Sequence, residues 1–165
     1  MDFSRFYDKY FARIHKYACW RANAPQEADD MTALIFEKLF KKYDSFDSSR
    51  ANIEVWAFTL ARNVVNDYYR WYKVRAFFST TDYEDTFAAP DDAALPLEQK
   101  ENSALLQKAL VKLDKRERDI LGLKYSQGFN NRQIAALTGL SESNTAVIIM
   151  RTLGKLKNIL NGEDL

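Results

Sequence analysis

The sequence predicts an all-α protein of two small helical domains joined by an acidic linker, the C-terminal domain being a helix-turn-helix. Only five glycines and three prolines occur in 165 residues, which favours long helices over a turn-rich β architecture. Apolar residues recur every three or four positions on both sides of residues 79–96, but not within them. No apolar run approaches the roughly 18 residues that span a bilayer, so no membrane insertion is expected.

The N-terminal domain, residues 1–78, is expected to be a three-helix unit with a polar loop at 44–52. Its helices are predicted over residues 3–22, 25–43 and 53–78. On the second helix the residues expected to face inward are Ala28, Met31, Leu34, Ile35, Leu39 and Phe40. On the third helix the expected inward stripe carries Val55, Trp56, Phe58, Leu60, Ala61, Val64, Val65, Tyr68 and Tyr72.

Residues 79–96 are predicted to be a linker, because they contain two prolines, five acids and no helical period. The net charge of +1 hides an uneven distribution along the chain. Residues 1–75 carry +3, residues 76–103 carry −6 and residues 104–165 carry +4. Two mildly basic domains flanking an acidic strip are compatible with nucleic-acid binding but do not by themselves identify it.

The C-terminal domain, residues 97–165, shows clear signals for helix ends. Capping boxes are expected at Asp114 with Glu117 and at Asn130 with Gln133, and Ser141 caps the last helix. Glycines at 128 and 139 end the preceding helices. The helices are predicted over residues 97–113, 115–126, 131–138 and 142–160.

Residues 130–157 have the pattern of a helix-turn-helix. Ala135 is small where the two helices approach, Gly139 supplies a left-handed turn residue, and Leu140 enters the core. Such a turn can project its second helix into a major groove. A purely structural αα-corner gives the same pattern, so this motif alone does not decide between the two.

A second signal lies on the third helix, where aromatic and basic residues alternate. Bases of a separated strand stack on aromatic rings, and cations neutralise its phosphates. The alternative is a core helix with half-buried aromatics, which fits Tyr68 and Tyr72 better than Trp71, since Trp71 lies off the inward stripe. The residues concerned are Arg62, Tyr68, Tyr69, Arg70, Trp71, Tyr72, Lys73 and Arg75.

Two stretches resemble one family. "LDKRERDILGLKYSQGFNNRQIAALTGLSESNTAVIIMRTLGKLK" resembles the upstream-element-binding domain of bacterial sigma factors, and "EADDMTALIFEKLF…VWAFTLARNVVNDYYR" resembles their core-binding and promoter-melting domain. Length, order and the lack of a middle domain are similar to the extracytoplasmic-function (ECF) type. The resemblance implies a promoter-specificity subunit that binds the core polymerase (β′ clamp helices and β flap), promoter DNA and an anti-sigma factor, in the cytoplasm and without a cofactor.

The resemblance also implies roles for particular residues. The loop 44–52, with Phe46 and Asn52, matches a loop that captures a flipped base of the minus-ten element, and Asn63 matches a base-contacting asparagine. Asp67 and Arg70 complete the same N-x-x-x-D-x-x-R pattern, beside Arg62, Trp71, Lys73 and Arg75. The surface matching the clamp contact comprises Asp29, Asp30, Ala33, Phe36 and Glu37. The acidic linker resembles the segment that the family threads along the polymerase cleft, although a solvated tether has the same composition.

Two of the predicted helices depart from the family pattern. Ala33 and Leu34 replace a common Gln and Glu on the clamp-facing helix, and the usual basic positions of the recognition helix are Ala146 and Ile148. One hypothesis is that Val147 and Ile148 meet thymine methyl groups. The other is that this apolar face is covered by an anti-sigma factor or by the N-terminal domain. The residues predicted to meet the minus-thirty-five element are Arg132, Asn144, Val147, Ile148, Arg151 and Lys155.

Other function classes fit less well. A sigma-like decoy that acts through protein binding is the main alternative, and a helix-turn-helix repressor leaves the first 75 residues unexplained. No catalytic or metal motif is present: His15 is the only histidine and has no plausible partner in the sequence. Cys19 is the only cysteine, without a nearby base, and is expected to be a packed thiol in a reducing compartment.

Overall fold

The computed structural model describes residues 2–78 and 97–162, with side chains for 2–72 and 98–162. These residues form α-helices with one π-helical turn and no strand, which confirms the predicted all-α class. The predicted linker, 79–96, lies outside the described residues. The elements are α1 (Phe3–Arg21), α2 (Pro25–Tyr43), α3 (Ile53–Phe78), α4 (Leu97–Val111), α5 (Lys115–Leu121), η1 (Gly122–Ser126), α6 (Asn131–Thr138) and α7 (Glu142–Leu160).

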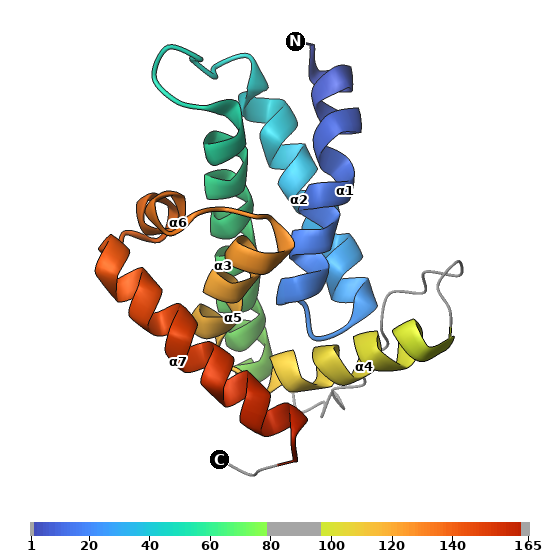
Figure 1. The fold of residues 1–165 in the computed structure, drawn as a ribbon. Coiled ribbons are helices and arrows are strands. Elements are labelled where there is room, and N and C mark those ends of the chain that lie inside the picture. The colour runs from blue at the N-terminus through green and yellow to red at the C-terminus, as the bar shows by residue number, and fades with distance from the viewer. Residues whose placement is uncertain (1, 79–96, 163–165) are drawn as a thin grey trace.

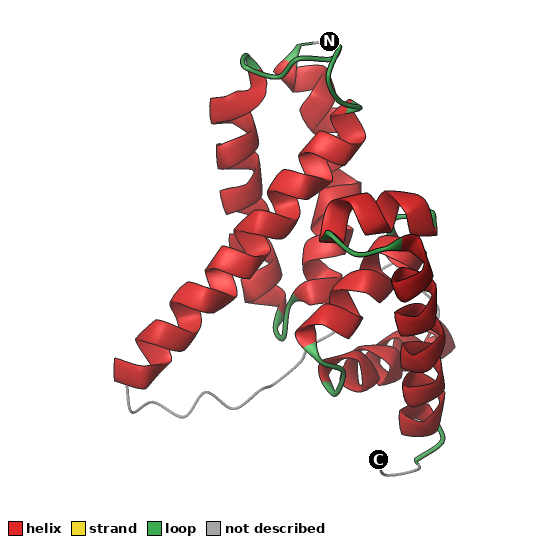
Figure 2. Cartoon of the chain, turned by 90° about the vertical axis from the view of Figure 1, so that its left-hand side faces the viewer, coloured by secondary structure: helices red, strands yellow, loops and turns green. Residues whose placement is uncertain are grey.

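The helices form two lobes that pack against each other. Helices α1, α2 and α3 make the N-terminal lobe, and α4 to α7 make the C-terminal lobe, which contacts α1 and α3 through α5, η1 and α6 (Figure 1). Helix α3 is the longest element and extends beyond the rest of its lobe (Figure 2).

Local chemistry fixes the helix ends as predicted. Asp114 and Asn130 each accept a hydrogen bond from the third residue of the helix that follows, completing two capping boxes. Ser141 accepts from Asn144 N at the start of α7. Gly128 and Gly139 both have a φ of +74°, which is why glycine is favoured at these two turns.

One predicted helix is interrupted. The sequence predicts a continuous helix over 115–126, but the α-helix ends at Leu121 and continues as the π-helical turn η1. At this turn Gly122 faces the Trp20 indole so closely that a Cβ there would lie 2.6 Å from Trp20 Cδ1. The glycine therefore permits the close approach of η1 to α1, a long-range constraint that no local signal predicts.

The buried apolar side chains of both lobes form one continuous cluster. Phe58 of α3 is fully buried, and its ring lies edge-on to Tyr17 of α1 and to Phe129 of the C-terminal lobe, at 5.8 and 5.2 Å between centroids. This ring therefore contributes to both lobes and to the contact between them.

The predicted inward faces are partly wrong. On α2, Leu34 and Phe40 are 43% and 65% exposed, whereas Phe36 is buried. On α3, Tyr69 is the buried tyrosine, while Tyr68 and Tyr72 are only half-buried. The phase is shifted because α2 packs against α1 on one side and α3 on the other, and because Tyr69 donates a hydrogen bond to Arg21 O at the end of α1.

A similar shift occurs on α7. The apolar spacing of Ile149, Leu153, Leu156 and Leu160 predicts an inward stripe on this helix, but Leu153 and Leu160 are 38% and 50% exposed, and Thr152 is buried instead. Ile148, predicted to face away from the core, is half-buried and packs against it. Helices α4, α5 and α6 pack against α7, and its buried face is centred on Thr145, Ile149 and Thr152.

Candidate nucleic-acid interface

Helix α3 presents one solvent-facing stripe of side chains that carry nucleic-acid chemistry. Asn63, Asp67, Arg70 and Trp71 are all exposed and lie three or four residues apart, so they share a face of the helix. Trp71 is 58% exposed, which is unusual for a large ring in a packed protein. Asp67 pairs with Arg70 (Oδ1 to Nη1, 3.4 Å) and with Lys38 of α2 (Oδ2 to Nζ, 3.9 Å). The stripe thus combines the Asn63 amide, the Trp71 ring and an arginine that forms an ion pair with Asp67.

Beside this stripe lies a groove of about 680 Å³ between α2 and α3. Its floor is apolar and its rim carries three lysines and two acids. Its lining residues are Leu34, Glu37, Lys38, Lys41, Lys42, Val64, Asp67, Tyr68 and Trp71. Two residues of the α3 stripe therefore also border this groove.

The loop before α3 is held by its own side chains. Phe46 packs against Trp56, with ring centroids 4.9 Å apart. The side-chain oxygen of exposed Asn52 accepts a hydrogen bond from Glu54 N, so this residue acts as a cap for α3. Asp47 accepts from Ser49 and pairs with Arg50, which fixes the turn.

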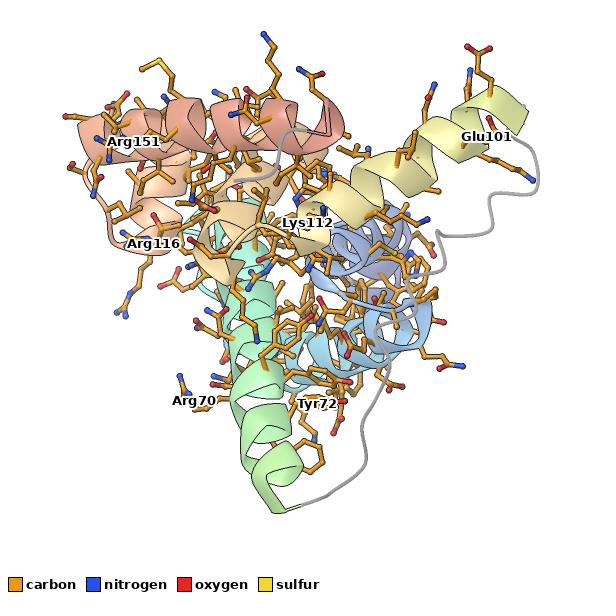
Figure 3. The ribbon with its side chains drawn as sticks, turned by 90° about the horizontal axis from the view of Figure 1, so that it is seen from below. Arg70, Tyr72, Glu101, Lys112, Arg116 and Arg151 are labelled. Atoms are coloured by element: carbon orange, nitrogen blue, oxygen red, sulfur yellow. The ribbon has the colours of Figure 1, made fainter. Side chains whose placement is uncertain are left out.

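The predicted basic residues of α3 do not share one surface. Arg70 is exposed, and Figure 3 shows it projecting from α3 in a different direction from Tyr72. Arg62 instead lies between the lobes, with its side chain 15% exposed, and binds Asp119 and Leu137 O. In this arrangement Arg62 is not placed to contact DNA. The side chains of Lys73 and Arg75 lie outside the described ones.

The tyrosines of α3 divide between core and surface. Tyr69 is buried, and burial raises the pKa of its phenol well above the ordinary value, so it stays protonated and donates to Arg21 O at 2.7 Å. The rings of Tyr68 and Tyr72 are stacked, with an interplanar angle of 13° and centroids 6.4 Å apart. Trp71 is thus the aromatic side chain of this stretch that is best placed to meet a base.

The recognition face of α7 is apolar at its centre. Asn144, Val147 and Arg151 are exposed on α7, as predicted. Met150, which the sequence analysis did not single out, is 71% exposed. Its position could have been found, because residues 147 and 150 lie only about 60° apart on a helix of 100° per residue. The apolar surface of α7 is therefore formed by Val147, Met150 and Leu153, and Ile148 belongs to the core side.

The two remaining predicted contacts of this domain differ in availability. Arg132 is exposed on α6. Lys155 is half-exposed and forms an ion pair with Glu117 of α5, which raises the pKa of its ammonium through their hydrogen bond. Lys155 therefore links α7 to α5 in addition to facing solvent.

Of the five α2 residues predicted to bind the core polymerase, four are exposed and one is buried. Asp29, Asp30, Ala33 and Glu37 are exposed. Phe36 is not part of this face: it is 7% exposed and packs against Tyr7 and Phe11 of α1, with centroids 4.7 and 5.7 Å away. The physical reason is that α1 covers this side of α2.

A polar cluster between the lobes is the main feature that the sequence analysis missed. Asp119 of α5 is 3% exposed and accepts from Tyr17, Arg21 and Arg62 of the N-terminal lobe. Burial raises the pKa of Tyr17 far above its ordinary value, which keeps the phenol protonated as a donor. The only local signal was an acid next to the apolar pair Ile120 and Leu121.

His15 and Cys19 have neighbours that the sequence analysis did not foresee. His15 Nε2 lies 3.1 Å from Asp29 Oδ1, so the expectation of no partner was wrong. Cys19 Sγ lies 3.7 Å from His15 Nδ1, one helical turn away, so the thiol does have a nearby base. Burial, together with the charge of Asp29, raises the pKa of Cys19 to about 11.

We expect Cys19 to react slowly with thiol reagents. With a pKa of about 11, its thiolate fraction at pH 8 is roughly a hundredfold below that of an ordinary cysteine. Stopped-flow reaction with a disulfide reagent should show this slowing in the folded chain and lose it in urea. Reaction at the rate of free cysteine in the folded state would contradict this prediction.

Neither a metal-binding cluster nor a membrane-spanning helix occurs among the described residues. No group of three or more His, Cys, Asp or Glu residues there could hold a metal ion. None of the described helices has both the length and the apolar character needed to cross a bilayer.

Comparison with known proteins matches both lobes. Residues 6–73 match the family Sigma-70 region 2, and residues 103–156 match the family Sigma-70, region 4. The ECF RNA polymerase sigma factor BldN of Streptomyces coelicolor is 26% identical over 161 residues, covering 96% of this chain but only 60% of BldN. RNA polymerase sigma factor SigZ of Bacillus subtilis is 24% identical over 162 residues, covering 98% of this chain and 89% of SigZ.

Solved structures show the same fold. The sigma factor RpoE from Bartonella quintana, in complex with the anti-sigma factor NepR, superposes with a TM-score of 0.81 at 22% identity over 99% of both chains. CnrH, in complex with the cytosolic domain of CnrY, gives a TM-score of 0.71 at 20% identity over 98% of this chain and 89% of CnrH.

The fold defines a two-lobed helical protein whose C-terminal lobe contains a helix-turn-helix, with one face of the second helix exposed. Both family matches fall in the expected order and together cover most of the chain. The chain belongs to the sigma-70 family and is a sigma factor of the extracytoplasmic-function type.

Proposed function

We propose that this chain is a promoter-specificity subunit of bacterial RNA polymerase, which binds the core enzyme and recognises and opens promoter DNA. The observation that supports this most is the exposure of two separate reading surfaces, one in each family region. These are the α3 face with Asn63 and Trp71, and the α7 face with Asn144 and Arg151. Catalysis then belongs to the polymerase, and this chain acts in the cytoplasm as a binding subunit.

The α3 face is suited to a separated strand. An exposed asparagine can pair with a base edge, and an exposed tryptophan can stack on a base. We assign to this minus-ten surface Asn63, Asp67, Arg70 and Trp71, with Phe46 and Asn52 of the adjoining loop and with Lys73 and Arg75. Binding energy from an extruded base and the strand offsets a melting cost of a few kcal/mol.

The α7 face is suited to bind duplex DNA through few positively charged side chains. Asn144 can read a base edge, Val147 can meet a thymine methyl group, and Arg151 and Arg132 can bind phosphates. Ile148 and Lys155 contribute less directly, since one packs into the core and the other pairs with Glu117. We expect weaker salt dependence than for a helix with lysine or arginine at the exposed position 146, by about one slope unit for that missing contact.

The proposed protein partners are assigned to exposed surfaces on α2 and on the C-terminal lobe. The exposed acids of α2, with Ala33 and Glu37, form the proposed contact with the core polymerase at its β′ clamp helices, and the C-terminal lobe meets the β flap. Two relatives of the same fold were solved as complexes, one with an anti-sigma factor and one with the cytosolic domain of CnrY. We infer that an anti-sigma factor also regulates this chain.

In vitro transcription tests the proposal. Core polymerase with this chain should start transcripts at specific sites on bacterial DNA, read by sequencing of 5′ ends. Asn63→Ala should lower specific transcription roughly 5- to 150-fold, because one base contact contributes about 1–3 kcal/mol. Asn102→Ala, on the exposed side of α4, is the matched control and should leave transcription unchanged. An absence of specific start sites for the wild-type chain would overturn the proposal.

A sigma-like decoy is the second candidate, favoured by the apolar surfaces. Leu34 is 43% exposed where the family commonly has an acid, and Met150 is 71% exposed on α7. A decoy binds a regulator and touches DNA little. Stable binding of an anti-sigma factor, together with no co-purification with core polymerase, would favour it over the leading proposal.

A further inference from the structure

The Asp119 carboxylate occupies an anion-binding site that belongs entirely to the other lobe. Oδ1 lies 2.6 Å from Arg21 Nη1 and 2.6 Å from the Tyr17 hydroxyl. Oδ2 lies 2.8 Å from both Nε and Nη2 of Arg62. The donors all come from α1 and α3, whereas the C-terminal lobe supplies the Asp119 carboxylate and Leu137 O, which accepts from Nη1 of Arg62.

The N-terminal lobe itself positions the Arg21 side of the site, while Arg62 is oriented by Asp119 and Leu137 O of the other lobe. The second terminal nitrogen of Arg21 donates to Asn66 Oδ1 at 3.0 Å, and the first donates also to the Tyr17 hydroxyl at 2.7 Å. Arg21 and Tyr17 are buried side chains within one helical turn of each other. Two guanidinium groups converging on one point repel each other unless an anion lies between them, so the site favours an anion whether or not Asp119 is present.

The chemistry of these donors is not specific for a carboxylate. Guanidinium forks bind phosphate oxygens with the same bidentate geometry. Arg62 and Asn66 also flank the α3 stripe, since Asn63 directly follows Arg62 in the helix. A phosphate bound here would therefore be next to the surface proposed to read the minus-ten strand.

We infer that Arg21, Arg62 and Tyr17 form a site for a phosphodiester of promoter DNA, and that Asp119 occupies this site while the lobes are packed together. The inference rests on the proposed function and adds a contact to it. Asp119 then acts as an intramolecular competitor of DNA, and separation of the lobes exchanges a carboxylate for a phosphate.

Distance requires this separation. Elements centred ten and thirty-five base pairs upstream lie about 85 Å apart at 3.4 Å per base pair. The longest element of the protein, the 26-residue α3, spans about 39 Å at 1.5 Å per residue. The packed arrangement cannot place α3 and α7 on both elements at once. When α5 moves away with the C-terminal lobe, Asp119 leaves with it and the arginine pair becomes available.

Binding of a labelled 20-nucleotide single strand of mixed sequence to the full chain tests the inference. Phosphate contacts are independent of sequence, so no promoter consensus is needed. Asp119→Asn should bind at least about fivefold more tightly than the wild type, the lower end of typical coupling between linked sites. Adding Arg62→Gln to this variant should reduce the slope of log K against log salt by about 0.7, the value for one phosphate of a single strand.

The control is Glu101→Gln, which removes one negative charge at the outer end of α4, away from α1 and α3 (Figure 3). It should change affinity far less than Asp119→Asn. Equal affinity and equal slope for wild type and a folded Asp119→Asn would overturn the inference. Circular dichroism establishes the folded state of each variant.

A second measurement keeps the test decisive if the Asp119 variant does not fold. When core polymerase holds this chain on a promoter fragment, the spacing of about 85 Å between the two elements requires the lobes to separate, so Arg62→Gln alone should lower the salt slope of fragment binding by about 0.9. An unchanged slope would again overturn the inference. Failure of the wild-type chain to bind core polymerase is a failure of the proposed function instead, and the single-strand experiment does not depend on it.

Discussion

Phe58→Ala should lower the free energy of unfolding by about 3–5 kcal/mol, the cost of removing a fully buried aromatic ring. The ring is 0% exposed and lies edge-on to Tyr17 and Phe129, so its loss leaves a cavity lined by both lobes. The surrounding backbone can fill little of this space, because α1 and the segment before α6 border the ring through Tyr17 and Phe129. Urea denaturation followed by far-UV circular dichroism measures the effect.

Phe40→Ala is the matched control for this change. Phe40 is 65% exposed and contacts the edge of the Phe3 ring, so its removal should cost no more than about 1 kcal/mol. If Phe58→Ala and Phe40→Ala lower the free energy of unfolding by similar amounts, Phe58 is not buried between the lobes as described above.

Arg118→Ala is expected to destabilise the protein by about 3 kcal/mol, since it removes charge-assisted hydrogen bonds of about 1.5–3 kcal/mol each. The Arg118 guanidinium donates to Trp20 O at 2.7 Å, to Asn23 Oδ1 at 2.8 Å and to Ala22 O. These groups lie at the C-terminal end of α1, where helix carbonyls lack partners within the helix. An arginine from the other lobe thus satisfies the end of α1.

Arg116→Ala provides the comparison, because Arg116 is exposed on the same helix and its loss should change stability by no more than about 0.5 kcal/mol. Arg118→Lys should recover only part of the loss, since one ammonium cannot reproduce the planar fork. Equal denaturation midpoints for Arg118→Ala and Arg116→Ala would contradict the described role of Arg118.

The two lobes explain why the predicted DNA contacts differ in their availability. Asn63, Arg70 and Trp71 face solvent, whereas Arg62, one residue before Asn63, faces the other lobe. On a helix, neighbouring residues point about 100° apart, so adjacent positions can serve the surface and an interface at once. A list of basic residues along α3 could not separate these roles.

The amino-acid sequence by itself determined the helices, their ends and the helix-turn-helix. Capping boxes at Asp114 and Asn130, and the left-handed glycine at 139, depend on residues within one turn of each other, so local chemistry is sufficient. The order of the two family regions is also a property of the sequence. The sequence also predicted the surface stripe of α3 that includes Asn63. In the structure the side chains of this stripe are exposed.

Only the tertiary structure decided which side of each helix is buried and how the lobes meet. A helix such as α2 has apolar residues on more than one side, and packing against both α1 and α3 buried Phe36 and left Leu34 and Phe40 exposed. Asp119 meets Arg21 and Arg62 across 98 and 57 residues. Ion pairs between residues so far apart in the sequence form only when whole helices pack together. Burying the Asp119 charge is unfavourable unless its cationic partners lie beside it in the folded protein.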